Sequence, residues 1–273
     1  MHVLELKTSP HAPGISPVRI HYRDIGAGPV VVFLHGGWGY GAYPIDYQIE
    51  AHQLEALGST IRFIIPDRSG HGRSTYFPGP LPLDFHRRAA EETLLVLDKL
   101  KIHRATFWGH SDGAVIASLI GLQAPERCQR LILEAFHLYR DKPNSRAVFF
   151  QKFARHPEEV SERMRKRLLE DHGARHWKNV VQRNCKVWLD LADATTKPDD
   201  DLYDGRLNEL KVPVTFLHGR GDPRTEPGEI ERAHKMIAGS ELHYLEEGRH
   251  SPHSERASWE KCNAILRELT TKK

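Results

Sequence analysis

The sequence is short of cysteine, of long apolar runs and of net charge, and each shortage excludes a class of protein. Three cysteines, Cys128, Cys185 and Cys262, are far apart and odd in number. They argue against a disulfide framework and form no CxxC metal motif, which favours a reducing compartment. No apolar stretch approaches the roughly 20 residues that span a bilayer, and the charged first residues do not resemble a secretory signal. These absences predict a soluble cytoplasmic protein without a membrane span.

The formal net charge of +3 is too small to indicate a nucleic-acid partner. The chain also lacks internal repeats and low-complexity tracts. At 273 residues it has room for one large domain or two small ones, and the positions of its motifs favour one domain with an insertion. Nothing in the composition distinguishes a monomer from a homodimer.

The most informative segment is Gly109-His110-Ser111-Asp112-Gly113, a G-x-S-x-G pattern. An apolar run over 104–108 precedes it and predicts a buried strand, and the apolar run over 114–120 predicts a helix. A serine on so sharp a strand-to-helix turn is strained, and its hydroxyl lies at a helix N-terminus. Glycines flank it because a Cβ there would collide with neighbouring elements. This context predicts that Ser111 is a nucleophile.

A serine nucleophile needs a base and an orienting carboxylate, and both follow in the chain. Asp222 comes just after a predicted strand over 212–219, and His250 comes just after another over 241–245. Since the carboxyl ends of parallel strands meet at one edge of a sheet, we expect these two side chains beside Ser111.

Other residues compete for these two roles. His253 is expected at the start of a final helix over 253–269, and His71 lies in a glycine-rich turn, so His250 is the favoured base. Asp199, Asp200 and Asp201 lie in a solvated surface segment, so Asp222 is the favoured acid.

Backbone amides for an oxyanion are expected at two places. A strand over 29–34 runs into His35-Gly36-Gly37-Trp38, where glycines let the backbone approach the nucleophile. We predict one donor at the amide of Gly37, with Trp38 as the neighbour that could replace it. The second is the amide of Asp112, directly after the serine.

The order of elements predicts an α/β fold with a mostly parallel, doubly wound sheet and helices on both faces. Strands and helices alternate over residues 1–135 and again over 206–273. Between them, residues 136–205 are helix-favouring, basic and rich in aromatics. We call this predicted insertion the cap.

The turn Asp67-Arg68-Ser69-Gly70-His71-Gly72-Arg73-Ser74 completes a set of motifs that resembles the α/β-hydrolase superfamily. The segments 111–113, 218–223 and 248–250, with Trp188 in the cap, are similar to the biphenyl-hydrolase-like, valacyclovir-hydrolase group. The resemblance implies a Ser111–Asp222–His250 triad under a helical cap. It implies neither a metal nor an organic cofactor.

Asp112 has two interpretations at this stage. Its carboxylate can simply complement the dipole of the helix that it opens. The resemblance implies a second role, since the acid beside the nucleophile in that group is associated with binding a substrate's α-amino group. Trp38 and Trp188 are further candidates for contact with substrate. The basic cap is either a solvated surface or a lid that attracts acidic substrates.

We therefore expect a serine hydrolase of small-molecule carboxylic esters that works through an acyl-enzyme, with α-amino-acid esters as one candidate class. The same triad serves C–C bond hydrolases and lactonases, which stay open as alternatives. Serine at position 111 departs from the aspartate used by epoxide hydrolases of this fold. A more distant alternative is a ligand-binding protein without catalytic activity.

Overall fold

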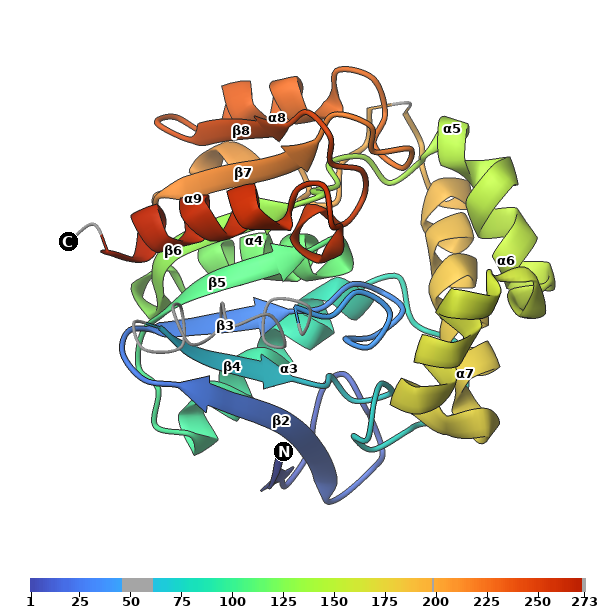
Figure 1. Ribbon diagram of the computed structural model, residues 1–273. Coiled ribbons are helices and arrows are strands. Elements are labelled where there is room, and N and C mark those ends of the chain that lie inside the picture. Colours follow the sequence, from blue (N-terminus) through green and yellow to red (C-terminus); the bar gives the residue numbers. More distant parts are fainter. Residues whose placement is uncertain (46–60, 198, 272–273) are drawn as a thin grey trace.

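One sheet of eight strands forms the centre of the computed structural model, which describes residues 1–45, 61–197 and 199–271. In the order of pairing, the strands are β1 (His2–Leu6), β2 (Val18–Gly26), β4 (Arg62–Pro66), β3 (Val30–Leu34), β5 (Ala105–His110), β6 (Cys128–Glu134), β7 (Val214–Gly219) and β8 (Glu241–Leu245). The β1–β2 and β2–β4 pairs are antiparallel, and all pairs from β4 to β8 are parallel. The predicted α/β fold is confirmed (Figure 1).

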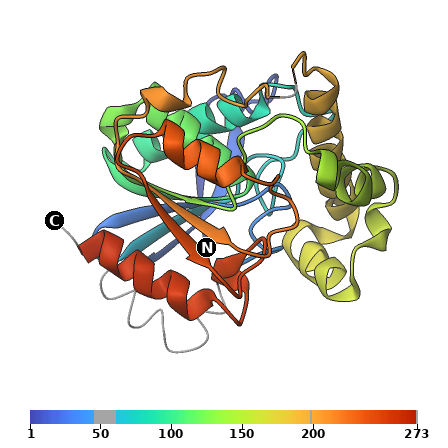
Figure 2. The same ribbon diagram turned by 90° about the horizontal axis from the view of Figure 1, so that it is seen from above.

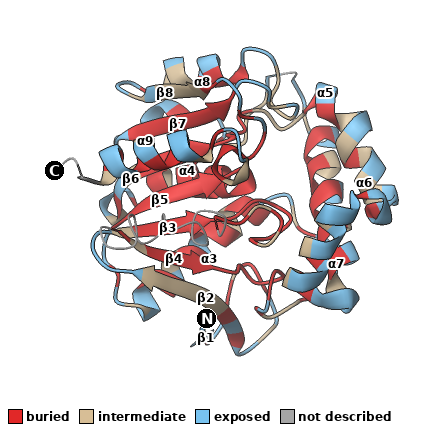
Figure 3. Ribbon diagram, in the orientation of Figure 1, coloured by how far each residue is buried: buried red, intermediate tan, exposed pale blue. Residues whose placement is uncertain are grey.

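Helices cover both faces of this sheet. On one face lie α3 (Phe85–Lys99), α4 (Asp112–Gln123) and α8 (Glu229–Met236), and on the other lies α9 (Trp259–Thr271) (Figure 2). Single 3-10 turns, η1 (Pro125–Arg127), η4 (Leu207–Glu209) and η5 (Pro252–Ser254), precede β6, β7 and α9. The central strands are therefore shielded from water on both faces, as their continuous apolar sequences require (Figure 3).

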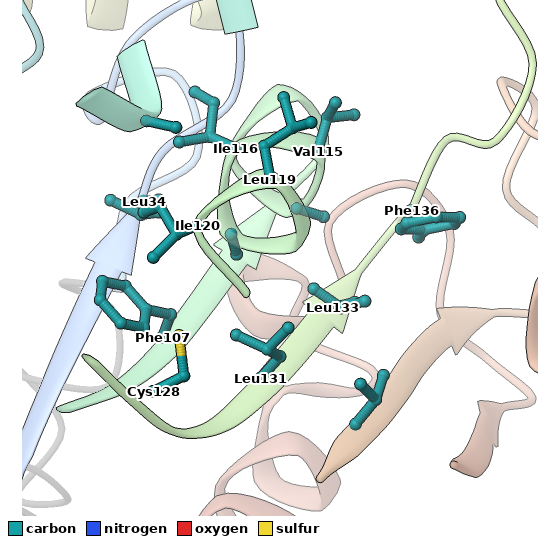
Figure 4. Close-up of a cluster of buried hydrophobic side chains, with 14 of the residues drawn as sticks. Leu34, Phe107, Val115, Ile116, Leu119, Ile120, Cys128, Leu131, Leu133 and Phe136 are labelled. Atoms are coloured by element: carbon teal, nitrogen blue, oxygen red, sulfur yellow. The ribbon is translucent and has the colours of Figure 1, made fainter. Parts of the chain in front are cut away.

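Helix α4 follows Ser111 directly, and most of this helix is buried. Its residues from Asp112 to Gly121 are all buried, so it has no polar face toward water. Val115 and Leu119 belong to the same apolar cluster as Phe107 on β5 and Leu131 on β6 (Figure 4). Such close packing fixes the N-terminus of α4, and with it the residue that precedes this helix.

The chain between β6 and β7 is helical and lies beside the carboxyl ends of the parallel strands (Figure 1). It comprises α5 (Pro143–Ser145), the π-helical η2 (Arg146–Gln151), α6 (Lys152–Arg155), η3 (Pro157–Glu159) and α7 (Glu162–Asp193). Helix α7 bends at Gly173, whose φ of 72° and ψ of 166° are not helical. This segment covers the edge of the sheet where the sequence places the reactive residues.

The two ends of the cap run side by side at its base. Tyr139 and Asp201 form an isolated antiparallel bridge, and the amide of Leu202 donates to the carbonyl of Leu138 at 2.9 Å. This bridge lies within 136–205, a range in which the sequence predicts no strand. The division into core residues 1–135, cap residues 136–205 and core residues 206–273 stays a prediction.

The start of the final helix was placed wrongly by the sequence. His253 lies in η5, and α9 begins only at Trp259. The reason is that His253 is held by β6: its amide and its Nδ1 lie 3.0 Å and 2.8 Å from Oε1 of Glu134. Within the described residues, no helix combines the length and the apolar character needed to cross a bilayer.

Candidate active site

Ser111 connects β5 to α4 in a backbone conformation that is rare for a residue with a side chain. Its φ is 55° and its ψ is −122°, a strain that costs about 1–3 kcal/mol. The amide of Ser111 donates to the carbonyl of Glu134 on β6 at 2.9 Å. The neighbouring strand thus holds the turn that presents the hydroxyl at the N-terminus of α4.

The two glycines of the turn are required by space. A Cβ at Gly109 would lie 2.1 Å from the carbonyl oxygen of Gly113, and one at Gly113 would lie 1.9 Å from that of Leu34. Both contacts are with backbone, which cannot move aside. The expected collision of any larger residue at these positions is confirmed.

Asp222 and His250 meet at the same edge of the sheet. The Nδ1 atom of His250 lies 3.0 Å from both carboxylate oxygens of Asp222. Asp222 also accepts from the amide of Arg224 at 2.8 Å and from the hydroxyl of Thr225 at 3.2 Å. These donors fix the carboxylate and direct the Nε2 atom of His250 away from it.

The two groups have complementary charge states. Burial opposes the charge of Asp222, but His250 and the other hydrogen-bond donors hold the pKa of this carboxyl well below its ordinary value. Burial lowers the pKa of the His250 imidazole, and Asp222 offsets only part of that effect. At neutral pH the pair is therefore a carboxylate beside a neutral imidazole, which is the state that can accept a proton.

The histidines and aspartates that the sequence analysis set aside as base and acid have other partners. The Nε2 atom of His71 is 3.0 Å from the carbonyl of Gly37, and His253 faces Glu134. Asp199 pairs with Arg232, and Asp201 bonds backbone amides at the base of the cap. Asp200 accepts from Thr196 and Lys197.

The hydroxyl of Ser111 contacts a histidine that the sequence analysis missed. Its Oγ lies 3.4 Å from Nε2 of His137, whereas Nε2 of His250 is buried without a hydrogen-bond partner among the described residues. For His250 to accept its proton, the hydroxyl of Ser111 would have to turn from His137 toward His250. His137 follows the carboxyl end of β6 by three residues, so the rule that identified Asp222 and His250 also applied to it.

His137 is a neutral, enclosed imidazole. Its ring is stacked on that of His250 with centroids 5.9 Å apart and meets the ring of Trp188 edge-on at 5.1 Å. Burial lowers the pKa of His137, and the charge of Lys142 lowers it further. An uncharged ring beside Ser111 can donate or accept one hydrogen bond.

The predicted oxyanion donors lie around Ser111. Asp112 is the first residue of α4, so its amide has no acceptor within the helix. Gly37 lines the same cavity as Ser111 and lies against the cap, since a Cβ there would be 2.2 Å from Nδ2 of Asn184. The use of these two amides, and of Trp38 as the alternative to Gly37, stays a prediction.

The side chain of Asp112 is fully enclosed and already accepts two hydrogen bonds. Its oxygens accept from Asn184 Nδ2 at 2.6 Å and Trp188 Nε1 at 2.9 Å, both on α7. Nε2 of His86 on α3 lies 3.2 Å away. Burial opposes its charge, but His86 and other donors keep the pKa of Asp112 below its ordinary value. This carboxylate therefore joins the core to the cap, a role that neither sequence interpretation included.

The cavity at Ser111 is closed in this structure. Its volume is about 20 Å³, which is enough for roughly one water molecule. Trp38, Phe149, Phe150 and Trp188 supply aromatic walls, and Arg224 lines it as well. Any substrate larger than water requires part of the enclosure to move.

The chain matches the alpha/beta hydrolase family over residues 31–259. The protein belongs to this family. It is 26% identical over 241 residues to "Serine hydrolase BPHL" of Homo sapiens, which covers 88% of this chain and 79% of the relative.

Two further relatives cover nearly the whole chain. A 2-hydroxy-6-oxo-6-phenylhexa-2,4-dienoate hydrolase of Burkholderia cepacia is 26% identical over 275 residues, covering 93% of this chain and 91% of that one. The solved structure of a thermophilic esterase from Thermogutta terrifontis superimposes with a TM-score of 0.70 at 20% identity, covering 98% of each chain. The family and the fold of this hydrolase are thereby established.

Within the described part of this α/β hydrolase, His110, Glu134 and His253 bring potential metal-ligand atoms within 4.8 Å of one another. Their hydrogen bonds indicate another role. The two ring nitrogens of His253 face acceptors, Nδ1 at 2.8 Å from Glu134 and Nε2 at 2.8 Å from the carbonyl of Tyr43. Burial opposes its charge, but Glu134 raises the pKa of His253. Below that raised pKa the ring carries both protons and forms an ion pair with Glu134.

Proposed function

We propose that this hydrolase cleaves small-molecule carboxylic esters with Ser111 as nucleophile, His250 as base and Asp222 as the orienting acid. The observation that carries the proposal is the Asp222–His250 pair. It leaves Nε2 of His250 without a hydrogen-bond partner among the described residues, at the edge of the sheet where a strained turn presents Ser111. The architecture supports acyl transfer because it combines a nucleophile, a base and a backbone amide at the helix N-terminus that has no acceptor within the helix.

The reaction begins when the Ser111 hydroxyl turns from His137 to His250 and attacks the ester carbonyl. His250 takes the hydroxyl proton, and Asp222 stabilises the resulting imidazolium. The amides of Gly37 and Asp112 bind the oxyanion, and loss of one such donor commonly costs about 100- to 1,000-fold in rate. His250 gives the proton to the departing alcohol. Water, activated by His250, then releases the acid from the acyl-enzyme.

A preference for α-amino-acid esters is a second candidate, carried by the position of Asp112 next to the nucleophile. An ammonium group could pair with this buried carboxylate. It would first have to displace donors that are already present, chiefly Asn184 and Trp188. We therefore favour esters without an amino group, with Trp38 and Trp188 as apolar contacts.

A C–C bond hydrolase with the same triad is supported by the similarity to the Burkholderia cepacia enzyme. The choice of substrate distinguishes the two activities. Turnover of a vinylogous diketone indicates a C–C bond hydrolase, and turnover of a simple alkyl ester indicates an esterase. A lactone of matching size tests the lactonase alternative in the same assay.

The first experiment is steady-state hydrolysis of 4-nitrophenyl butyrate with Ser111→Ala and, as a matched control, Ser240→Ala, which changes a serine just before β8. We expect Ser111→Ala to lower kcat by at least about 10⁴-fold, and Ser240→Ala to retain activity. Intact-protein mass spectrometry should detect a butyryl adduct on Ser111 during turnover. Esterase activity that survives in Ser111→Ala would refute the assignment.

A further inference from the structure

Arg224 brings a positive charge into the catalytic cavity. It follows Asp222 by two residues and lines the cavity together with Ser111. Its guanidinium carbon lies 3.7 Å from the ring centre of Phe149 and 5.6 Å from that of Trp38. Both rings line the same cavity, so the charged end of Arg224 lies between the core and the cap, against the aromatic wall.

The guanidinium of Arg224 donates to a neutral, weak hydrogen-bond acceptor. Nη2 of Arg224 donates to the hydroxyl of Tyr43 at 3.2 Å, and no carboxylate of the described residues lies within ion-pair distance. Two other shielded cations are neutralised by carboxylates: Arg23 pairs with Asp67, and Lys142 pairs with Glu229. A cation held among aromatic rings beside a neutral oxygen is an attractive site for an anion, because a carboxylate accepts far more strongly than a phenol.

Tyr43 also borders the outer surface. It lines both the catalytic cavity and a groove of about 1060 Å³ between the start of α7 and the residues before α9. Among the described residues, the charged side chains along this groove are Arg163, Arg167, Arg249, Arg256, Glu247 and Glu255. The carboxylate of Glu255 already accepts from two backbone amides. Tyr43 therefore lies where this groove meets the catalytic cavity.

We propose that Arg224 binds a carboxylate of the substrate, so that the esters cleaved by this enzyme are acidic esters such as half-esters of dicarboxylic acids. In the free enzyme the hydroxyl of Tyr43 occupies the place of that carboxylate. Entry from the groove moves Tyr43 aside, and the guanidinium exchanges a neutral acceptor for a charged one. This inference rests on the proposed esterase function and assigns its substrate class.

The test compares esters of matched length and shape. Monomethyl glutarate carries the carboxylate on the acyl side, butyryloxyacetate carries it on the alcohol side, and methyl pentanoate is the neutral reference. The variants are Arg224→Gln and, as a matched control, Arg206→Gln, which removes an exposed arginine paired with Glu209. Acid release is followed in a pH-stat.

We expect the wild type to favour one of the acidic esters over methyl pentanoate by about 10- to 100-fold in kcat/KM, as a charge-assisted hydrogen bond provides. Arg224→Gln should reduce that ratio by a similar factor, mainly through KM, whereas Arg206→Gln should leave it unchanged. The acidic ester that is favoured shows which side of the ester bond faces Arg224. A preference for the neutral ester, or an equal loss on all three esters in Arg224→Gln, would overturn the proposal.

A binding measurement separates this inference from the esterase assignment. Glutarate binding is measured by calorimetry with wild type and Arg224→Gln, without any turnover. Binding that is lost in Arg224→Gln supports the carboxylate site even if no ester is cleaved, whereas equal binding by both proteins refutes it. If Ser111 fails to react with a fluorophosphonate, the esterase function alone is refuted.

Discussion

Replacement of Asp112 by Asn should weaken the attachment of the cap without changing the choice among substrates. The Asp112 carboxylate accepts from Asn184 and Trp188 in a site that is 1% exposed. Hydrogen bonds to a charged partner contribute about 1.5–3 kcal/mol each, and neutral ones about half as much. Asparagine keeps both bonds if Asn184 reverses its amide, so we expect a loss of about 1.5–3 kcal/mol.

Urea denaturation at pH 7 measures this loss. The pKa of Asp112 is lowered, so its contribution to stability is present above the ordinary carboxyl pKa and is lost only in acid. Trp188→Phe removes one donor, and a double-mutant cycle with Asp112→Asn should show a coupling of about 1 kcal/mol or more. Asp190→Asn, at an exposed ion pair on α7, is the control and should cost less than about 1 kcal/mol.

The same variant distinguishes the cap contact from an ammonium site. If Asp112 only joins α4 to the cap, the ratio of kcat/KM for an alanine ester to that for a propionate ester is the same in Asp112→Asn and wild type. A preference for the amino ester that collapses in the variant would refute the cap interpretation. Additive free energies for Asp112→Asn and Trp188→Phe would refute it independently.

Two further predictions concern titration. Because burial lowers the pKa of His250 below its ordinary value of 6.5, the acidic limb of the kcat/KM profile should lie below pH 6.5, and a limb above that value would contradict the assignment. Because Glu134 raises the pKa of His253, the ion pair stabilises the protein fully below pH 6.5 and less as pH rises through the raised value. His253→Gln should therefore cost about 3–5 kcal/mol at pH 6 and less at pH 9 in urea denaturation; a loss that grows with pH would refute this.

The chemistry-bearing positions could be located from sequence because they depend on local pattern and on one topological rule. The apolar run before Gly109 and the one after Gly113 define a strand, a turn and a helix without reference to the rest of the chain. Asp222 and His250 each follow a strand, and parallel strands bring their carboxyl ends to one edge.

The predicted helix boundary was less accurate where a tertiary contact competed with the local preference of the sequence for a helix. The segment at His253 has helical sequence character, yet the hydrogen bonds from its amide and ring to Glu134 hold it in a short turn. Helix α9 therefore begins six residues later, at Trp259. A contact between residues 119 positions apart leaves no periodic signal in either segment.

The sequence by itself determined the fold class, the strained turn at Ser111 and the order of the residues proposed as its partners, because these follow from short-range patterns and strand direction. Only the tertiary structure decided which groups each of these side chains contacts. It brought His137 to the nucleophile, joined Asp112 to α7 across 72 and 76 residues of sequence, and placed Arg224 against an aromatic wall. Such contacts depend on how the cap packs on the core, which local sequence preferences do not specify.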